Sequence, residues 1–106
     1  MTTLSTHVLD AARGRPASAL SLSLHDPHGE LLASASTDRD GRARFDVELD
    51  AGIHRLVFDT GDWFARQGRD TFYPEVAVAF TVEPGTDHLH APLLLGPFSY
   101  TTYRGS

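Results

Sequence analysis

The sequence of 106 residues contains no cysteine and no lysine. Without cysteine the chain forms no disulfide and has no thiolate for a metal ion or a substrate. No segment approaches the run of about 18 apolar residues that spans a bilayer. The polar residues 1–15 also lack the apolar core of a signal peptide. We therefore expect a soluble, cytoplasmic protein with no membrane partner.

All nine basic residues are arginines, against 14 acidic residues, and the formal net charge is −5. The arginines are scattered and form no basic stripe of the kind that binds nucleic acid. We expect no nucleic-acid partner. The length suits one domain, residues 1–106, around one hydrophobic core. No repeat or linker indicates a second domain.

Apolar side chains recur at every second position in several short runs, which is typical of half-buried strands. Turn-forming Gly, Pro and Asp residues separate the runs. This pattern predicts an all-β fold, an eight-stranded antiparallel β-sandwich. The predicted strands lie near residues 5–10, 18–25, 30–36, 42–49, 53–59, 75–82, 88–95 and 98–104.

Residues 60–68 interrupt the strand pattern and predict one short helix. Asp62 is the candidate N-cap and Gly68 the C-terminal glycine. Four aromatic residues in and after this segment are expected in the core or in a contact between subunits: Trp63, Phe64, Phe72 and Tyr73.

The run Leu93-Leu94-Leu95 is apolar on both faces of its predicted strand. A strand has this character when the core covers one face and a partner subunit covers the other. The run therefore favours an oligomer. If the last strand lies at a sheet edge, pairing with its copy would protect the edge and form a two-fold dimer.

The chain ends in Tyr103-Arg104-Gly105-Ser106, directly after the last predicted strand. Termini are usually disordered unless the structure holds them. An ending that joins an arginine, a hydroxyl and the α-carboxylate suggests part of a functional site. From spacing alone, an exposed terminus without a role remains the alternative.

Several separated stretches carry a resemblance to a known family: residues 4–10 with 14–17, 37–42, 72–76, 88–95 and 101–106. They resemble the transthyretin-related 5-hydroxyisourate hydrolases, the enzymes that follow urate oxidase in purine breakdown. Members of this family are similar in being eight-stranded sandwiches that form tetramers. The resemblance implies a homotetramer, a dimer of dimers, with active sites where two dimers face each other.

The resemblance also implies the reaction, the hydrolysis of 5-hydroxyisourate to 2-oxo-4-hydroxy-4-carboxy-5-ureidoimidazoline without a cofactor. The implied catalytic residues are His7, Arg42, His90 and Ser106. The implied substrate-binding residues are these four together with Tyr103, Arg104 and Gly105. The sequence departs from the family pattern at Leu89, Ala91 and Gly96, which affects the expected shape of the pocket.

The chemistry of these residue types fits such a reaction. Histidine, with an unperturbed pKa of about 6.5, can take a proton from water and return one to a leaving nitrogen. Arginine is a permanently charged donor that can stabilise negative charge on a carbonyl oxygen. A site in which His7, His88 and His90 bind a metal is a weak alternative, and we predict no metal. Three other histidines neighbour turns and are expected to be solvated: His25, His28 and His54.

Two other functions compete with the hydrolase. A carrier for a small aromatic ligand, like transthyretin, would use the channel between dimers, but it has no need of the two catalytic histidines, Arg42 and the terminal serine together. The weakest reading is a structural sandwich domain, such as a fragment of an adhesin or cell-wall protein.

Overall fold

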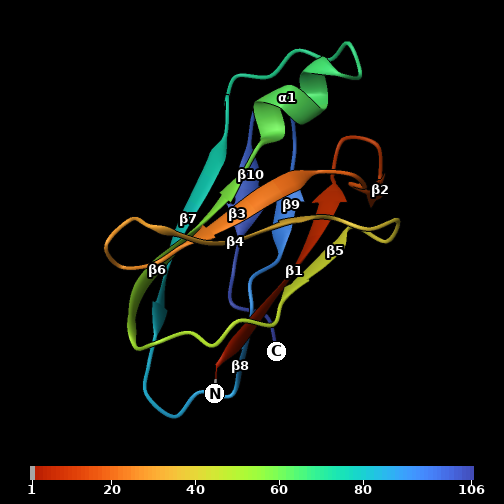
Figure 1. Cartoon of the computed structure of the whole chain (residues 1–106). Coiled ribbons are helices and arrows are strands. Elements are labelled where there is room, and N and C mark those ends of the chain that lie inside the picture. The colour runs from red at the N-terminus through yellow and green to blue at the C-terminus, as the bar shows by residue number, and fades with distance from the viewer. Residues whose placement is uncertain (1) are drawn as a thin grey trace.

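The computed structural model describes residues 2–106, which form two β-sheets and one short helix (Figure 1). The elements in chain order are β1 (Thr3–Asp10), β2 (Arg15–Pro16), β3 (Ser21–His25), β4 (Leu31–Ser36), β5 (Arg42–Phe45), β6 (Gly52–Phe58), α1 (Thr60–Ala65), β7 (Val76–Val82), β8 (His88–His90), β9 (Leu93–Leu95) and β10 (Tyr100–Thr102). Helix α1 lies at one end of the sheets, whereas β8 and the C-terminus lie at the other (Figure 1).

Strand β1 organises the larger sheet. Six strands run in the order β10-β9-β1-β2, with β5 and β8 also paired to β1, while the other sheet runs β4-β3-β6-β7. Leu4 and Val8 of β1 are fully buried, and Ser5 and His7 between them are only half-buried. This period of two places Thr3, Ser5 and His7 together on the outer face of the sheet, whereas Thr6 and Asp10 are buried on the inner face.

The predicted sandwich with one short helix is confirmed, and each predicted strand segment contains a strand. Residues 2–106 form ten strands because β2 is additional and the predicted strand 88–95 is divided into β8 and β9. Pro92 lies at the division, where its missing N–H interrupts the ladder. β1 pairs in parallel with β8 and β9, whereas the sequence pattern predicts antiparallel pairing.

The aromatic residues of α1 belong to the core between the sheets. Trp63 and Phe64 are both buried, as predicted. The indole N–H of Trp63 donates to the carbonyl of Ser18 at 2.8 Å and so connects α1 to the chain before β3. Phe72 is 72% exposed and therefore lies outside the core. Of its two predicted locations, only a contact between subunits remains.

The ends of α1 differ in part from the prediction. The N-cap is Asp59, without a side-chain capping bond, and Asp62 lies in the first turn, where its charge favours the helix N-terminus. Gly68 follows the helix with a φ of +67°, as a C-terminal glycine does. No helix within residues 2–106 has both the length and the apolar character needed to cross a membrane.

The expectation that His54 is solvated is wrong, because this residue is 1% exposed. It lies in β6 opposite Phe80 of β7, and the two ring centroids are 5.9 Å apart. Burial follows because the residue falls on an inward position of a strand that begins at Gly52. His25 is half-buried beside a serine hydroxyl, and His28 is exposed as predicted.

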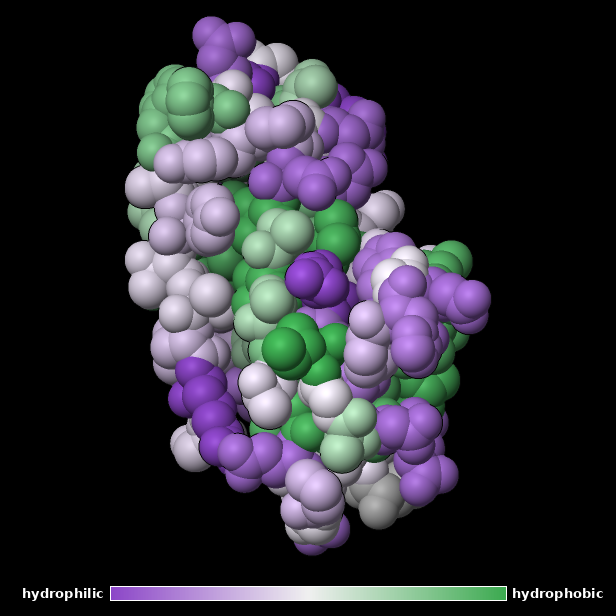
Figure 2. Space-filling model, turned by 90° about the vertical axis from the view of Figure 1, so that its left-hand side faces the viewer, coloured by the Kyte–Doolittle hydropathy of each residue, from purple (hydrophilic) through white to green (hydrophobic). Residues whose placement is uncertain are grey.

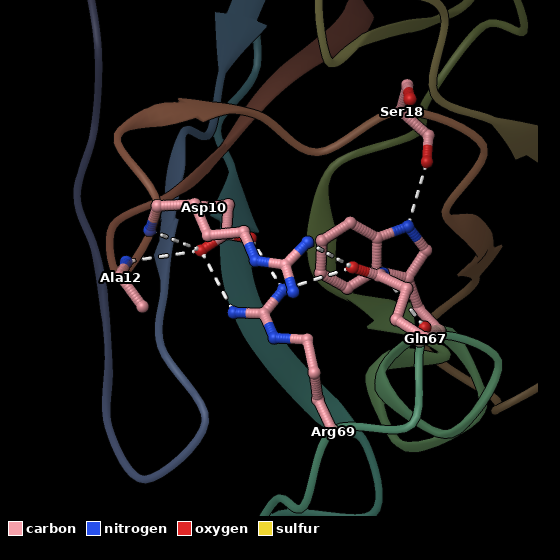
Figure 3. A network of polar contacts seen from close by, with 7 residues as sticks. Asp10, Ala12, Ser18, Gln67 and Arg69 are labelled. Atoms are coloured by element: carbon pink, nitrogen blue, oxygen red, sulfur yellow. Dashed lines mark hydrogen bonds and ion pairs between the residues drawn. The ribbon is translucent and has the colours of Figure 1, made fainter.

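A buried ion pair joins β1 to the segment after α1 (Figure 3). Arg69 donates from Nη1 to Oδ2 of Asp10 at 2.7 Å and from Nη2 to Oδ1 at 3.3 Å. The N–H groups of Ala12 and Arg13 also donate to Oδ1. Burial by itself would raise the pKa of Asp10, but the bonds from Arg69, Arg13 and Ala12 outweigh it and the pKa is lowered.

Candidate active site

The pairing of β1 with β5 brings His7 opposite Arg42. Arg42 is the first residue of β5 and follows directly after the turn at residues 38–41. In this turn the Asp38 carboxylate accepts the N–H groups of Asp40 at 2.8 Å and of Arg42 at 3.0 Å. The local turn chemistry therefore determines where β5 begins and which residue lies beside His7.

The turn stabilises the charge of the Asp38 carboxylate and contains a position, residue 41, that only glycine fits. The N–H of Arg42 is the main cause of the lowered pKa of Asp38, and the N–H of Asp40 lowers it further. Gly41 has a φ of +78°. A Cβ at this position would also clash with the carbonyl oxygen of Val8. Both conditions hold the turn tightly against β1.

The same turn orients the ring of His7. The Nε2 atom lies 2.9 Å from the carbonyl oxygen of Asp40. A carbonyl only accepts hydrogen bonds, so Nε2 carries the proton and donates it. The Nδ1 atom of the neutral ring then has a lone pair and can take a proton.

Strand β8 adds two histidines to the outer face of the larger sheet, where His7 lies, because β8 runs parallel to β1 with Thr3 opposite His88 and Ser5 opposite His90. We call His7, His88 and His90 together the histidine face. The hydroxyl of Ser5 lies 2.8 Å from Nε2 of His88 and 2.8 Å from Nδ1 of His90. The Thr3 hydroxyl lies 2.6 Å from Nδ1 of His88. Hydroxyl groups of β1 therefore hold both imidazole rings.

His90 is half-buried beside other basic groups. Burial is the largest cause that lowers its pKa from 6.5, and the charges of His7, His88 and Arg42 lower it further. A hydrogen bond with the backbone of Ser5 acts in the opposite direction. The ring is therefore neutral at neutral pH and can accept a proton.

The C-terminal residues lie beside His90. The N–H of Gly105 donates to the carbonyl of His90 at 2.8 Å, in an isolated antiparallel bridge. A Cβ on Gly105 would lie 2.6 Å from Cδ2 of His90, so glycine permits this close approach. Ser106 follows and is exposed. The terminus is thus held against the histidine face, while a role for the Ser106 hydroxyl stays a prediction.

His90 also lines an open groove of about 380 Å³ between β7 and the C-terminal segment. Phe80 lies on the β7 side, and Tyr103 and Arg104 lie on the other. Figure 2 views the molecule from the side on which β7 lies in Figure 1, where apolar side chains reach the surface between hydrophilic ones. The residues predicted to contact substrate are therefore divided between this groove and the histidine face.

Within residues 2–106, no group of three or more acidic or histidine side chains is arranged to hold a metal ion. His7, His88 and His90 share a face, but both ring nitrogens of His88 bond to hydroxyls. This arrangement favours hydrogen bonding over metal ligation.

The sequence reasoning missed Thr3 and Ser5. The period of two, counted back from His7, places both on its face and is a usable signal. Their contacts with His88 and His90 depend on the parallel register of β8, which no local pattern indicates.

Comparison with known proteins assigns the chain to a family. Residues 4–105 match the family model described as HIUase/Transthyretin family. The chain belongs to this family. It is 41% identical to the 5-hydroxyisourate hydrolase of Mus musculus, over 97% of this chain and 94% of the relative. The structure of Klebsiella pneumoniae 5-hydroxyisourate hydrolase is 42% identical, with a TM-score of 0.92 over 100% of both chains.

The chain is also similar to transthyretin, which the family description names beside the hydrolases. The sea bream transthyretin structure in complex with thyroxine is 33% identical, with a TM-score of 0.88 over 96% of this chain and 93% of that one. A shared fold does not by itself distinguish an enzyme from a carrier. The side chains of the site have to make that distinction.

Proposed function

We propose that this protein is an enzyme that hydrolyses 5-hydroxyisourate to 2-oxo-4-hydroxy-4-carboxy-5-ureidoimidazoline in urate breakdown. The observation that carries the proposal is the convergence of His7, Arg42 and His90 from three strands onto one face. The hydrolases similar to this chain over nearly its full length support the same activity. The reaction adds water to the substrate and requires no cofactor.

Water is a poor nucleophile at neutral pH, so the reaction needs a base. In its neutral form His7 presents a lone pair on Nδ1, because Nε2 carries the proton that is donated to the Asp40 carbonyl. His90 is kept neutral by its lowered pKa. Either imidazole can remove a proton from water. One of the two histidines can later return a proton to the leaving nitrogen of the acyl C–N bond in the substrate ring.

Attack by water places negative charge on the carbonyl oxygen of the substrate. Arg42 lies beside His7 and is exposed at the start of β5, where its guanidinium can donate to that oxygen. Tyr103, Arg104 and Gly105 are proposed to bind the polar, carbonyl-rich ring. We assign Ser106 to substrate or water positioning, since no contact among residues 2–106 marks its hydroxyl as an activated nucleophile.

We further propose that residues 1–106 form one domain and that four copies assemble as a dimer of dimers. The edge position of β10 supports this, because an edge strand has unpaired backbone groups that a second copy can pair. Aromatic side chains near this edge also favour burial by a partner: Phe72, Phe98, Tyr100 and Tyr103 are 72%, 67%, 38% and 55% exposed. A cytoplasmic location stays a prediction from the sequence.

The test produces 5-hydroxyisourate in situ from urate with urate oxidase and follows its ultraviolet decay, with chelator present throughout. Decay must exceed the spontaneous rate with the wild-type protein and fall to that rate in His7→Ala, Arg42→Ala and His90→Ala. The matched controls, His28→Ala and Arg55→Ala, change the same residue types at exposed positions away from the site and should keep full activity. Near-full activity in all three site variants would refute the assignment.

The carrier function is the second candidate, because the thyroxine-bound sea bream transthyretin structure also matches, with a TM-score of 0.88 against 0.92 for the hydrolase. It predicts measurable thyroxine binding and decay of 5-hydroxyisourate at only the spontaneous rate. Calorimetry on the same sample, first shown to be folded by circular dichroism, separates the two functions.

A further inference from the structure

Four side chains on the outer face of the larger sheet form one continuous hydrogen-bonded chain, of which the proposed function uses only His90. It runs from Thr3 to His88 at 2.6 Å, from His88 to Ser5 at 2.8 Å and from Ser5 to His90 at 2.8 Å. The parallel register of β1 and β8 produces it, since alternate hydroxyls of one strand lie opposite alternate histidines of the other. We refer to these four residues as the hydroxyl–histidine chain.

We propose that the hydroxyl–histidine chain is a proton relay that sets the tautomer of His90, so that its Nε2 serves first as base and then as acid. The inference deepens the proposed hydrolase activity and rests on it for its kinetic consequences. Ser5, His88 and Thr3 are positioning residues in this scheme, because they act on the reaction only through His90.

The argument depends on the single proton that each hydroxyl can donate. If Ser5 donates to Nδ1 of His90, it must accept from Nε2–H of His88, and Thr3 then donates to Nδ1 of His88. In this direction His90 carries its own proton on Nε2 and can act as an acid. If every bond reverses, Nδ1 of His90 carries the proton and its Nε2 is a base.

Reversal of the chain balances the protons of the reaction. Nε2 of His90 takes one proton from the attacking water, and Nδ1 of His90 passes its proton to Ser5. Ser5 passes its own to Nε2 of His88, Nδ1 of His88 passes one to Thr3, and Thr3 releases one to solvent. His90 then holds a proton on Nε2 for the leaving nitrogen, and the return of one proton from solvent restores the first state.

The surroundings of His90 explain why a neutral relay is useful. Three basic groups act on the pKa of its ring, His7 on β1, Arg42 on β5 and His88 on β8. The adjoining groove adds three charged or titratable residues: Glu83, Tyr103 and Arg104. His7, His88 and Arg42 disfavour a long-lived imidazolium and, together with burial, lower the pKa of His90. A relay lets this ring take up one proton and lose another without holding a net positive charge.

The kinetic test removes single links from the chain. Ser5→Ala breaks it, His88→Gln keeps a polar partner that cannot relay, and Ser5→Thr keeps the hydroxyl. We expect kcat to fall roughly 10- to 100-fold in the first two, less than the full contribution of a general base, with KM nearly unchanged. Ser5→Thr should retain activity. The matched control is Ser23→Ala, which removes a hydroxyl 2.8 Å from Nε2 of His25 on the other sheet.

The isotope effect distinguishes a relay from simple support of the ring. Measured across mixtures of light and heavy water, kcat of the wild type should indicate more than one proton in motion, whereas Ser5→Ala and His88→Gln should indicate one. The double variant should be no slower than either single variant, because both changes break the same chain. A one-proton dependence in the wild type would overturn the relay.

Nitrogen NMR of the histidine rings tests the tautomers without any substrate. In the wild type both ring nitrogens of His90 should resonate between the protonated and unprotonated positions. In Ser5→Ala and His88→Gln they should move to those of a single tautomer, while Ser23→Ala leaves them unchanged. Unchanged His90 signals in all variants would refute the relay, even if the wild type is an active hydrolase. If the His90 signals shift in Ser5→Ala and His88→Gln but the wild type is inactive, only the proposed function is refuted.

Discussion

Replacing Arg69 by methionine should destabilise the fold more than any loss of a surface charge. The side chain of Asp10 is 2% exposed and that of Arg69 is 13% exposed. Two hydrogen bonds of 2.7 and 3.3 Å join them, and the guanidinium also lies 4.8 Å from the ring centroid of Phe64. Arg69→Met leaves the carboxylate buried without its counter-charge, which costs about 3 to 5 kcal/mol of the free energy of unfolding.

Urea unfolding at one fixed protein concentration measures this loss. With a slope of about 1.5 kcal/mol per molar urea, the midpoint should fall by roughly 2 to 3 M. The matched control is Arg44→Met, since the Arg44 and Asp46 side chains of that ion pair are 62% and 75% exposed, and it should change the midpoint little. A shift in Arg69→Met as small as that in Arg44→Met would refute the reasoning.

The dependence on pH gives a second check. The pKa of Asp10 is lowered in the folded protein, so its stabilisation is present above the unfolded value of about 3.9 and is lost as the pH falls through the folded value. In Arg69→Met burial acts without the guanidinium and raises the pKa of Asp10. The difference between variant and wild type should then shrink between pH 7 and pH 4. Asp10→Asn combined with Arg69→Met should recover part of the loss.

Two further predictions concern the turn and the histidine face. Gly41→Ala should lower the urea midpoint more than Gly29→Ala. Both glycines have positive φ, but of the two only Gly41 has backbone atoms that an added Cβ would meet. Equal shifts of the midpoint would show that φ alone matters. The acid limb of kcat/KM should lie below pH 6.5, because the pKa of His90 is lowered, and His88→Gln should move it upward by removing one of the basic neighbours that lower this pKa; a limb at or above pH 6.5 in the wild type would contradict this assignment.

Local patterns in the sequence predicted much of the fold. Alternating apolar residues identified the strands, and the turn at residues 38–41 was placed correctly before Arg42. The resemblance to the hydrolases named His7, Arg42 and His90, which the structure brings to one face. The strand and turn predictions succeeded because strand period and turn chemistry depend on neighbouring residues. The catalytic roles of the three residues stay a prediction.

Other features depend on contacts between distant parts of the chain. His54 neighbours a turn in the sequence, yet pairing with β7 buries its ring against Phe80. The Asp10–Arg69 ion pair joins residues 59 positions apart. The period of two counted back from Leu56 places His54 on the buried face, whereas strand pairing decides that its ring meets Phe80. No local pattern indicates the ion pair.

The sequence by itself determined the β-sandwich, the family and the residues proposed for catalysis. Only the tertiary structure decided how β8 lies along β1, which places Thr3 opposite His88 and Ser5 opposite His90. Hydrogen bonds between side chains more than 80 residues apart require that register. A periodic pattern specifies which face a side chain occupies, whereas the pairing of strands specifies which side chain it meets.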